Sequence, residues 1–248
     1  MDKTILITGA TAGFGEAAAR KFIHGGWKVI GTGRRGDRLR KLQDELGDVF
    51  LPLEVDMRDR QAVEGLASLS SPWGDIDLLL NNAGLAPPTD PLPDTDWERL
   101  EEVIDTNVTG LVALTRALLP KLIDRKGQII NLSSVAATYP YKGGAVYAGT
   151  KAFVRQFSLD LRSDLAGTGV RVTSVEPGMA KTEFTVVRTG GDRQASDKLY
   201  GGMNPMTAQD LADLFWWIAT LPPHLNINVV ELMPVSQSFA GFTVTRGH

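Results

Sequence analysis

The sequence predicts an α/β fold in which one doubly wound parallel sheet is covered by helices on both faces. Short apolar, β-branched segments alternate with longer amphipathic segments, an order typical of parallel strands joined by right-handed helical crossovers. The 248 residues suffice for one large α/β domain, and no linker separates two halves. We therefore expect a single domain over residues 1–248, with a substrate loop at about 179–204 and a C-terminal tail at about 234–248.

The first half of the chain contains four expected strands and three expected helices. The first strand covers residues 4–8, and the helix after it, residues 16–24, ends at a pair of glycines. The elements that follow are a strand at 27–31, a helix at 38–46, a strand at 50–55, a helix at 61–68 and a strand at 76–80.

The second half continues the alternation after a long helical region at residues 96–107 and 111–124. Asn107 lies in this region close to Gly110, a combination that predicts a local distortion of the helix. The remaining expected elements are a strand at 128–132, a helix at 146–166, a strand at 170–175, a helix at 208–220 and a strand at 228–233.

The composition excludes several classes of function. A formal net charge of −3 provides no basic surface for nucleic acid, and the absence of cysteine excludes disulfides, thiolate metal sites and cysteine nucleophiles. The three histidines lack ligand spacing, so no metal site is expected. No signal-peptide pattern precedes the first strand, and no apolar run reaches the roughly 20 residues of a membrane helix. We therefore expect a cytoplasmic protein without a membrane partner.

Glycines at positions 9, 13 and 15 lie between the first expected strand and helix. Glycine there lets the backbone turn tightly and approach a pyrophosphate at the positive end of the helix. The spacing differs from both G-x-G-x-x-G and the Walker loop, so an ordinary turn is the alternative when the motif is taken alone. The strand–turn–helix context favours a dinucleotide site.

The end of the second expected strand indicates which dinucleotide binds. An NAD enzyme would usually carry an acidic residue there for the ribose hydroxyls. This chain instead has Arg34 and Arg35, which could bind a 2′-phosphate, although a solvated basic turn is the alternative. The sequence therefore favours NADP.

Tyr147 and Lys151 lie on one face at the start of an expected helix, because they are four residues apart. A lysine ammonium one turn away, with the positive charge of a nicotinamide nearby, would lower the tyrosine pKa from about 10, which would suit an acid/base. Alone, the pair is equally typical of a helix surface. Ser134 follows the strand at 128–132, at the edge where parallel sheets bind ligands.

Together these motifs resemble the short-chain dehydrogenase/reductase family over essentially the whole chain. The resemblance implies a Rossmann-type fold and an oxidoreductase that moves a hydride between nicotinamide and an alcohol or carbonyl carbon. Thr11-Ala12 and Phe14 stand where serine and isoleucine are commoner, a mild departure. The motifs that carry the resemblance are Thr8-Gly-x-x-x-Gly-x-Gly15, Asn81-Asn82-Ala83-Gly84, Asn107, Ser134, Tyr147-x-x-x-Lys151 and Pro177-Gly178.

The resemblance also implies a role for each motif residue. Tyr147 would be the acid/base, Ser134 would hold the substrate oxygen, and Lys151 would lower the tyrosine pKa and hold the nicotinamide ribose. Asn107 would complete the catalytic tetrad by supporting a proton-relay water. The expected cofactor-binding residues are Gly9, Thr11, Gly13, Phe14, Gly15, Arg34, Arg35, Asp56 (adenine), Asn82, Ala83, Gly84, Tyr147, Lys151, Pro177, Gly178 and Thr182 (nicotinamide amide).

A closer resemblance is to the branch of NADP-dependent 3-hydroxy acid dehydrogenases that includes the serine 3-dehydrogenases. It implies hydride transfer at C3 of a small acid such as L-serine, L-allo-threonine or 3-hydroxyisobutyrate. A sulfoacetaldehyde or malonic semialdehyde reductase and a broad carbonyl reductase are the alternatives. The resemblance lies in residues 8–16, 139–165, 176–184 and 221–239, and is strongest in 131–141, 187–191, 195–197 and 231–242.

Arg188 in the substrate loop is a candidate for binding the acid group, because a guanidinium can bind a carboxylate through two hydrogen bonds. An exposed arginine of a flexible loop is an equal alternative. Tyr141, Lys142 and Gln237 could complete the anion pocket, beside Ser134 and Tyr147 as further substrate contacts.

A homotetramer is expected, since the family usually assembles through the helices that correspond to residues 111–122 and 153–165. The main non-enzyme alternative is a nucleotide-sensing regulator, which would not need a complete tetrad. An epimerase is disfavoured, because nothing indicates a sugar-nucleotide domain beyond the single sheet.

Overall fold

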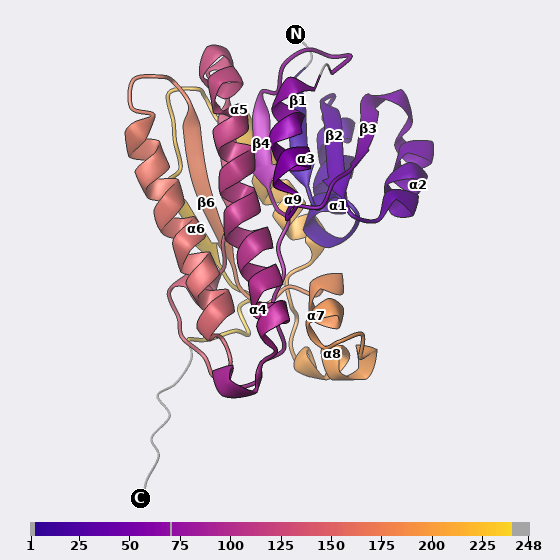
Figure 1. Ribbon diagram of the computed structural model, residues 1–248, viewed down its shortest axis with the longest axis vertical. Coiled ribbons are helices and arrows are strands. Elements are labelled where there is room, and N and C mark those ends of the chain that lie inside the picture. Colours follow the sequence, from indigo (N-terminus) through magenta and orange to yellow (C-terminus); the bar gives the residue numbers. More distant parts are fainter. Residues whose placement is uncertain (1–2, 70, 240–248) are drawn as a thin grey trace, which may run out of the picture.

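The computed structural model describes residues 3–69 and 71–239. Its centre is a seven-stranded sheet in the order β3-β2-β1-β4-β5-β6-β7, in which neighbouring strands are parallel (Figure 1). The predicted doubly wound α/β fold is therefore confirmed. The strands are β1 Thr4–Thr8, β2 Lys28–Gly33, β3 Phe50–Glu54, β4 Leu78–Asn81, β5 Gln128–Leu132, β6 Arg171–Pro177 and β7 Val229–Leu232.

The strand order reverses between β1 and β4, so their connections leave in opposite directions and open a crevice at the carboxyl ends of the strands. The strands β2 and β6 end at Gly33 and Pro177, two residues later than expected. Both extensions are paired, Gly33 with Glu54 and Pro177 with Leu232, so neighbouring strands rather than local sequence determine these ends.

Helices pack on both faces of the sheet and form two separate cores. Ile5 and Ile7 of β1 face one core, which contains Phe22 and Phe215, while Leu6 faces the other. This burial on both sides explains the uninterrupted apolar strands of the sequence. The helices are α1 Gly13–His24, α2 Gly36–Leu46, α3 Arg60–Gly65, α4 Trp97–Ile104, α5 Leu111–Arg125, α6 Ala145–Asp164, α7 Glu183–Arg188, α8 Arg193–Leu199 and α9 Ala208–Thr220.

The helical region after β4 contains the predicted distortion. Residues Asp105–Gly110 form a π-helix between α4 and α5. A Cβ at Gly110 would lie 2.2 Å from the Met57 carbonyl oxygen, so only glycine allows this close approach. The wider turn contains Asn107, whose side chain is buried next to the crevice.

Residues 179–204, called the lid below, contain two short helices that the sequence analysis did not predict. Thr182 caps α7 by accepting a hydrogen bond from the Phe184 amide, and Asp192 caps α8 in the same way through Ala195. The Tyr200 hydroxyl donates to the carbonyl of Ala180 at 2.8 Å, which ties the end of the lid to its beginning. Figure 1 shows α7 and α8 together, below the sheet. The lid is thus an ordered helical element.

None of the helices in the described ranges combines the length and the apolar character needed to cross a bilayer. Of the expected C-terminal tail, residues 234–239 belong to the described part, and residues 240–248 lie outside it.

Candidate active site

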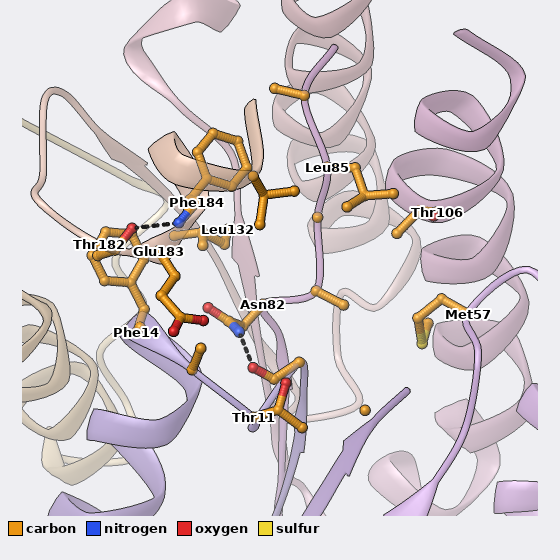
Figure 2. A pocket seen from close by; sticks show the side chains of 18 of the residues that line it. Thr11, Phe14, Met57, Asn82, Leu85, Thr106, Leu132, Thr182, Glu183 and Phe184 are labelled. Atoms are coloured by element: carbon orange, nitrogen blue, oxygen red, sulfur yellow. Dashed lines mark hydrogen bonds between the residues drawn. The ribbon is translucent and has the colours of Figure 1, made fainter. Parts of the chain in front are cut away.

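A cavity of about 470 Å³ lies at the carboxyl ends of the strands, between the glycine loop and the lid. Figure 2 shows Thr182, Glu183 and Phe184 on one side of it, and Leu85, Thr106 and Met57 on the other. Side chains far apart in the sequence therefore meet in one site. The predicted residues that line it are Gly9, Thr11, Gly13, Phe14, Arg34, Arg35, Asp56, Asn82, Ala83, Gly84, Ser134, Tyr147, Lys151, Pro177, Gly178 and Thr182.

The glycine loop, which joins β1 to α1, packs too closely against its surroundings and the loop after β4 to accommodate side chains at its glycines. Gly9 and Gly13 have φ angles of 71° and 56°, which favour glycine. A Cβ at Gly15 would lie 2.3 Å from the Gly9 carbonyl oxygen. The Asn82 amide donates to the carbonyl oxygens of Thr8 and Gly9, at 2.8 and 3.2 Å, and so holds the two loops together. The result is a narrow backbone cradle at the N-terminus of α1.

The arginine end of the cavity contains a carboxylate that the sequence analysis did not anticipate. Arg35 donates to the hydroxyl of Thr11 at 2.9 Å and to Glu183 Oε2 at 3.1 Å. Arg38 donates to the same Glu183 oxygen at 2.6 Å. These hydrogen bonds, first that of Arg38, hold the pKa of Glu183 below its usual range. The end of the second strand carries no acidic residue of its own, but the lid places the Glu183 carboxylate beside it.

Asp56, the expected adenine contact, is paired with a neighbouring arginine. Arg58 Nη2 lies 2.7 Å from Asp56 Oδ2, and its Nη1 lies 2.8 Å from Glu102 Oε1. The hydrogen bonds from Arg58 hold the pKa of Asp56 below its usual range. Asp56 therefore presents an ionised, fixed carboxylate at the edge of the cavity.

Tyr147 and Ser134 lie together at the opposite end of the cavity. Burial raises the pKa of Tyr147 to about 12, while a hydrogen bond with Ser134 and the positive charge of Arg188 oppose that rise. Ser134 Oγ also accepts a hydrogen bond from the Ala136 amide at 3.1 Å, which fixes its position. Phe184 of the lid packs 5.9 Å from the Tyr147 ring and covers it.

Lys151 and Tyr147 are both buried, and the pKa of each moves in the direction that opposes its charged form. Its Nζ donates to the Leu132 carbonyl at 2.7 Å and lies 5.8 Å from the centroid of the Tyr147 ring. Burial lowers the pKa of Lys151 to about 8. The reason is that both side chains are buried, so desolvation opposes both charged forms.

Asn107 lies beside the cavity lining and connects two elements. Its Oδ1 accepts from the Leu85 amide at 2.8 Å, and its Nδ2 donates to the Leu85 carbonyl at 2.8 Å and to Thr150 Oγ1 at 3.0 Å. These bonds attach the loop after β4 to α6, the helix that carries Tyr147.

Of the residues expected to form an anion pocket, the structure brings Arg188 and Tyr141 together, next to the residues that line the cavity rather than among them. Arg188 Nη2 donates to the Tyr141 hydroxyl at 2.8 Å, and its guanidinium carbon lies 5.6 Å from the centroid of the Tyr147 ring. Gln237 lies elsewhere, at the start of the lid, where its Oε1 accepts from the Met179 amide at 2.7 Å. Below, Arg188 and Tyr141 are called the acid clamp.

Several lining residues were not predicted from the sequence. Glu183, Phe184 and Val187 come from α7, while Leu85, Ala86, Met57 and Thr106 form the opposite wall. Only Glu183 had a usable signal, since it directly follows the predicted Thr182. Among the described residues, no group of three histidine or acidic side chains could hold a metal ion.

The comparisons with known proteins identify the family of the chain. A family model described as short chain dehydrogenase matches residues 3–191. The chain is 60% identical to a serine 3-dehydrogenase of Agrobacterium fabrum, over 99% of both chains. It is 53% identical to the NADP-dependent 3-hydroxy acid dehydrogenase YdfG of Escherichia coli K12, over 98% of this chain and 99% of that protein.

Among solved structures, the closed form of a serine dehydrogenase complexed with NADP+ aligns with a TM-score of 0.95 at 52% identity. The alignment covers 98% of this chain and 100% of that one. The family resemblance seen in the sequence is thereby confirmed: the chain belongs to the short chain dehydrogenase family.

Proposed function

We propose that this protein is an NADP-dependent 3-hydroxy acid dehydrogenase that acts at C3 of a small acid, with L-serine as the leading substrate. The observation that supports this best is the place of Arg188, 5.6 Å from the Tyr147 ring and beside the Tyr141 hydroxyl. A cation that close to the acid/base suits a substrate in which two carbons separate the carboxylate from the reacting hydroxyl, as in a 3-hydroxy acid. The names of the relatives support the same class of substrate.

The residues of the cavity fit NADP. The backbone cradle of Gly9, Gly13 and Gly15 would hold the pyrophosphate at the helix N-terminus. Arg34 and Arg35 would hold the 2′-phosphate, together with Arg38, which binds the same Glu183 oxygen as Arg35. When bound, the nicotinamide supplies the carbon that accepts or returns the hydride.

Side chains of the protein would bind the substrate oxygen and transfer its proton. Ser134 would hold the substrate hydroxyl, and Tyr147 Oη would take its proton during oxidation and return a proton during reduction. Because burial raises the pKa of Tyr147 to about 12, nearby positive charge is needed to form the phenolate. Arg188 supplies one such charge. The hydrogen bonds of Asn107 would hold α6 in place against the loop after β4.

The acid clamp would orient the substrate. Arg188 Nε is buried with no hydrogen-bond partner in the described part of the chain, and a bound carboxylate would supply an acceptor. The Tyr141 hydroxyl would add a second contact at the same group. A sulfonate offers the same acceptor chemistry, so sulfonates belong in the test.

The proposed reaction can be tested by following absorbance at 340 nm with NADP and with NAD. The substrates are L-serine, L-allo-threonine, 3-hydroxypropionate, 3-hydroxyisobutyrate, isethionate and a neutral secondary alcohol. We expect turnover of the carboxylic acids with NADP. Isethionate as the best substrate would indicate sulfonate metabolism, and activity on the neutral alcohol alone would refute the acid clamp.

We further propose that the protein is a cytoplasmic homotetramer with α5 and α6 at an interface. Phe153 of α6 is 41% exposed and stacks on Phe157 at 5.8 Å, which leaves an apolar surface on this helix. Light scattering coupled to size-exclusion chromatography tests the assembly, and a monomeric mass would contradict it.

A further inference from the structure

Helix α7 runs from the arginine end of the cavity to the acid clamp. Its first residue, Glu183, is bound to Arg35 and Arg38, and its last residue, Arg188, is bound to Tyr141 of the acid clamp. At about 1.5 Å per residue, six residues span roughly 8 Å, so both ends belong to one short rigid element. Arg35 and Arg38 therefore hold the first residue of the helix that carries Arg188.

The arginine pair, defined here as Arg35 and Arg38, already holds an anion from the chain itself. Both guanidiniums donate to the same oxygen of Glu183, at 3.1 and 2.6 Å. The three side chains are each about 40% exposed, so a ligand from solvent can reach them. A phosphate monoester is a stronger acceptor for guanidinium groups than a carboxylate, because it carries more charge and three oxygens.

We propose that Glu183 is a cofactor-selectivity residue, an internal anion that the 2′-phosphate of NADP displaces from the arginine pair. This inference rests on the proposed use of NADP. Displacement frees the first turn of α7 from α2, while Arg188 at the other end of α7 keeps its hydrogen bond with Tyr141. NAD has no 2′-phosphate, so it leaves Glu183 bound and α7 attached to α2.

The displacement of Glu183 can be tested without turnover, by calorimetric titration with adenosine 2′,5′-bisphosphate and with AMP. The variant is Glu183→Gln, and the matched control is Glu45→Gln, which removes the same charge from a 2.6 Å ion pair with Arg20. Exposed ion pairs shift equilibria by about two- to fivefold each. We expect Glu183→Gln to bind the bisphosphate about fivefold tighter and AMP unchanged, with neither affinity changed in Glu45→Gln.

Hydrogen exchange of the amides in residues 183–188 provides the second readout. In the wild type, the bisphosphate should speed amide exchange in α7, because its 2′-phosphate displaces Glu183, whereas AMP should not. Neither ligand has a nicotinamide that could reach the lid and protect it directly. Without any ligand, the amides of α7 in Glu183→Gln should already exchange faster than those of the wild type.

Two results overturn the proposal: unchanged or weaker binding of the bisphosphate to Glu183→Gln, and protection of α7 by the bisphosphate in the wild type. A wild-type protein that binds bisphosphate and AMP equally would instead refute the use of NADP. The experiment therefore distinguishes a failure of the proposed Glu183 displacement from a failure of the proposed cofactor.

Discussion

Replacement of Arg188 by glutamine removes the only charge of the acid clamp while keeping a polar side chain in the lid. Arg188 Nη2 lies 2.8 Å from the Tyr141 hydroxyl, and the guanidinium lies 5.6 Å from the Tyr147 ring. A hydrogen bond to a charged group contributes about 1.5–3 kcal/mol. Since about 1.4 kcal/mol corresponds to a tenfold change, KM for an acid substrate should rise about 10- to 100-fold.

The same substitution should change the pH dependence of turnover. The positive charge of Arg188 lowers the pKa of Tyr147, so its removal raises that pKa further. A larger share of Tyr147 is then protonated at a given pH, and the alkaline rise of kcat for oxidation should move to higher pH. Arg188→Lys keeps the charge but loses the planar fork, so it should retain the pH profile and lose part of the affinity.

Steady-state kinetics with L-serine and with a neutral secondary alcohol at several pH values would measure both effects. Arg193→Ala removes an exposed arginine from the neighbouring helix α8 and serves as the control. KM for the neutral alcohol should change less than about twofold in all variants, since that substrate has no anion for the clamp. An equal rise of KM for acid and alcohol would refute the reasoning.

Three further predictions concern Tyr147, the glycine cradle and Lys151. Tyr147→Phe should abolish turnover and keep NADPH binding, as measured by nucleotide fluorescence; near-normal turnover would exclude Tyr147 as the acid/base. Gly15→Ala places a Cβ 2.3 Å from a backbone oxygen and should cost about 1–3 kcal/mol, a fall of about 2–10 °C in Tm by calorimetry. Gly149→Ala is its control, because an added Cβ there meets no described atom within 4 Å. Lys151 has a pKa of about 8 in the folded chain, below the ordinary lysine pKa of 10.5, so the unfolded chain binds more protons between these pH values. The wild type should therefore gain stability relative to Lys151→Met, by about 3 kcal/mol from pH 8 to 10.5, and parallel denaturation curves across that range would contradict the pKa.

The sequence by itself determined the fold class, the family and the two ends of the cavity. Strands such as β1 and β5 have the expected ends, because their apolar, β-branched residues are sufficient to define them. Gly9, Tyr147 and Ser134 could be found because each belongs to a short local motif with its own chemical reason.

Only the tertiary structure decided which charges meet. Glu183 and Arg35 are 148 positions apart and have no common motif, so their ion pair follows from the folding of the lid over the nucleotide loop. The same holds for the burial that raises the pKa of Tyr147 and lowers that of Lys151. Local sequence encodes backbone conformation, whereas desolvation and long-range ion pairs depend on neighbours that only the folded chain provides.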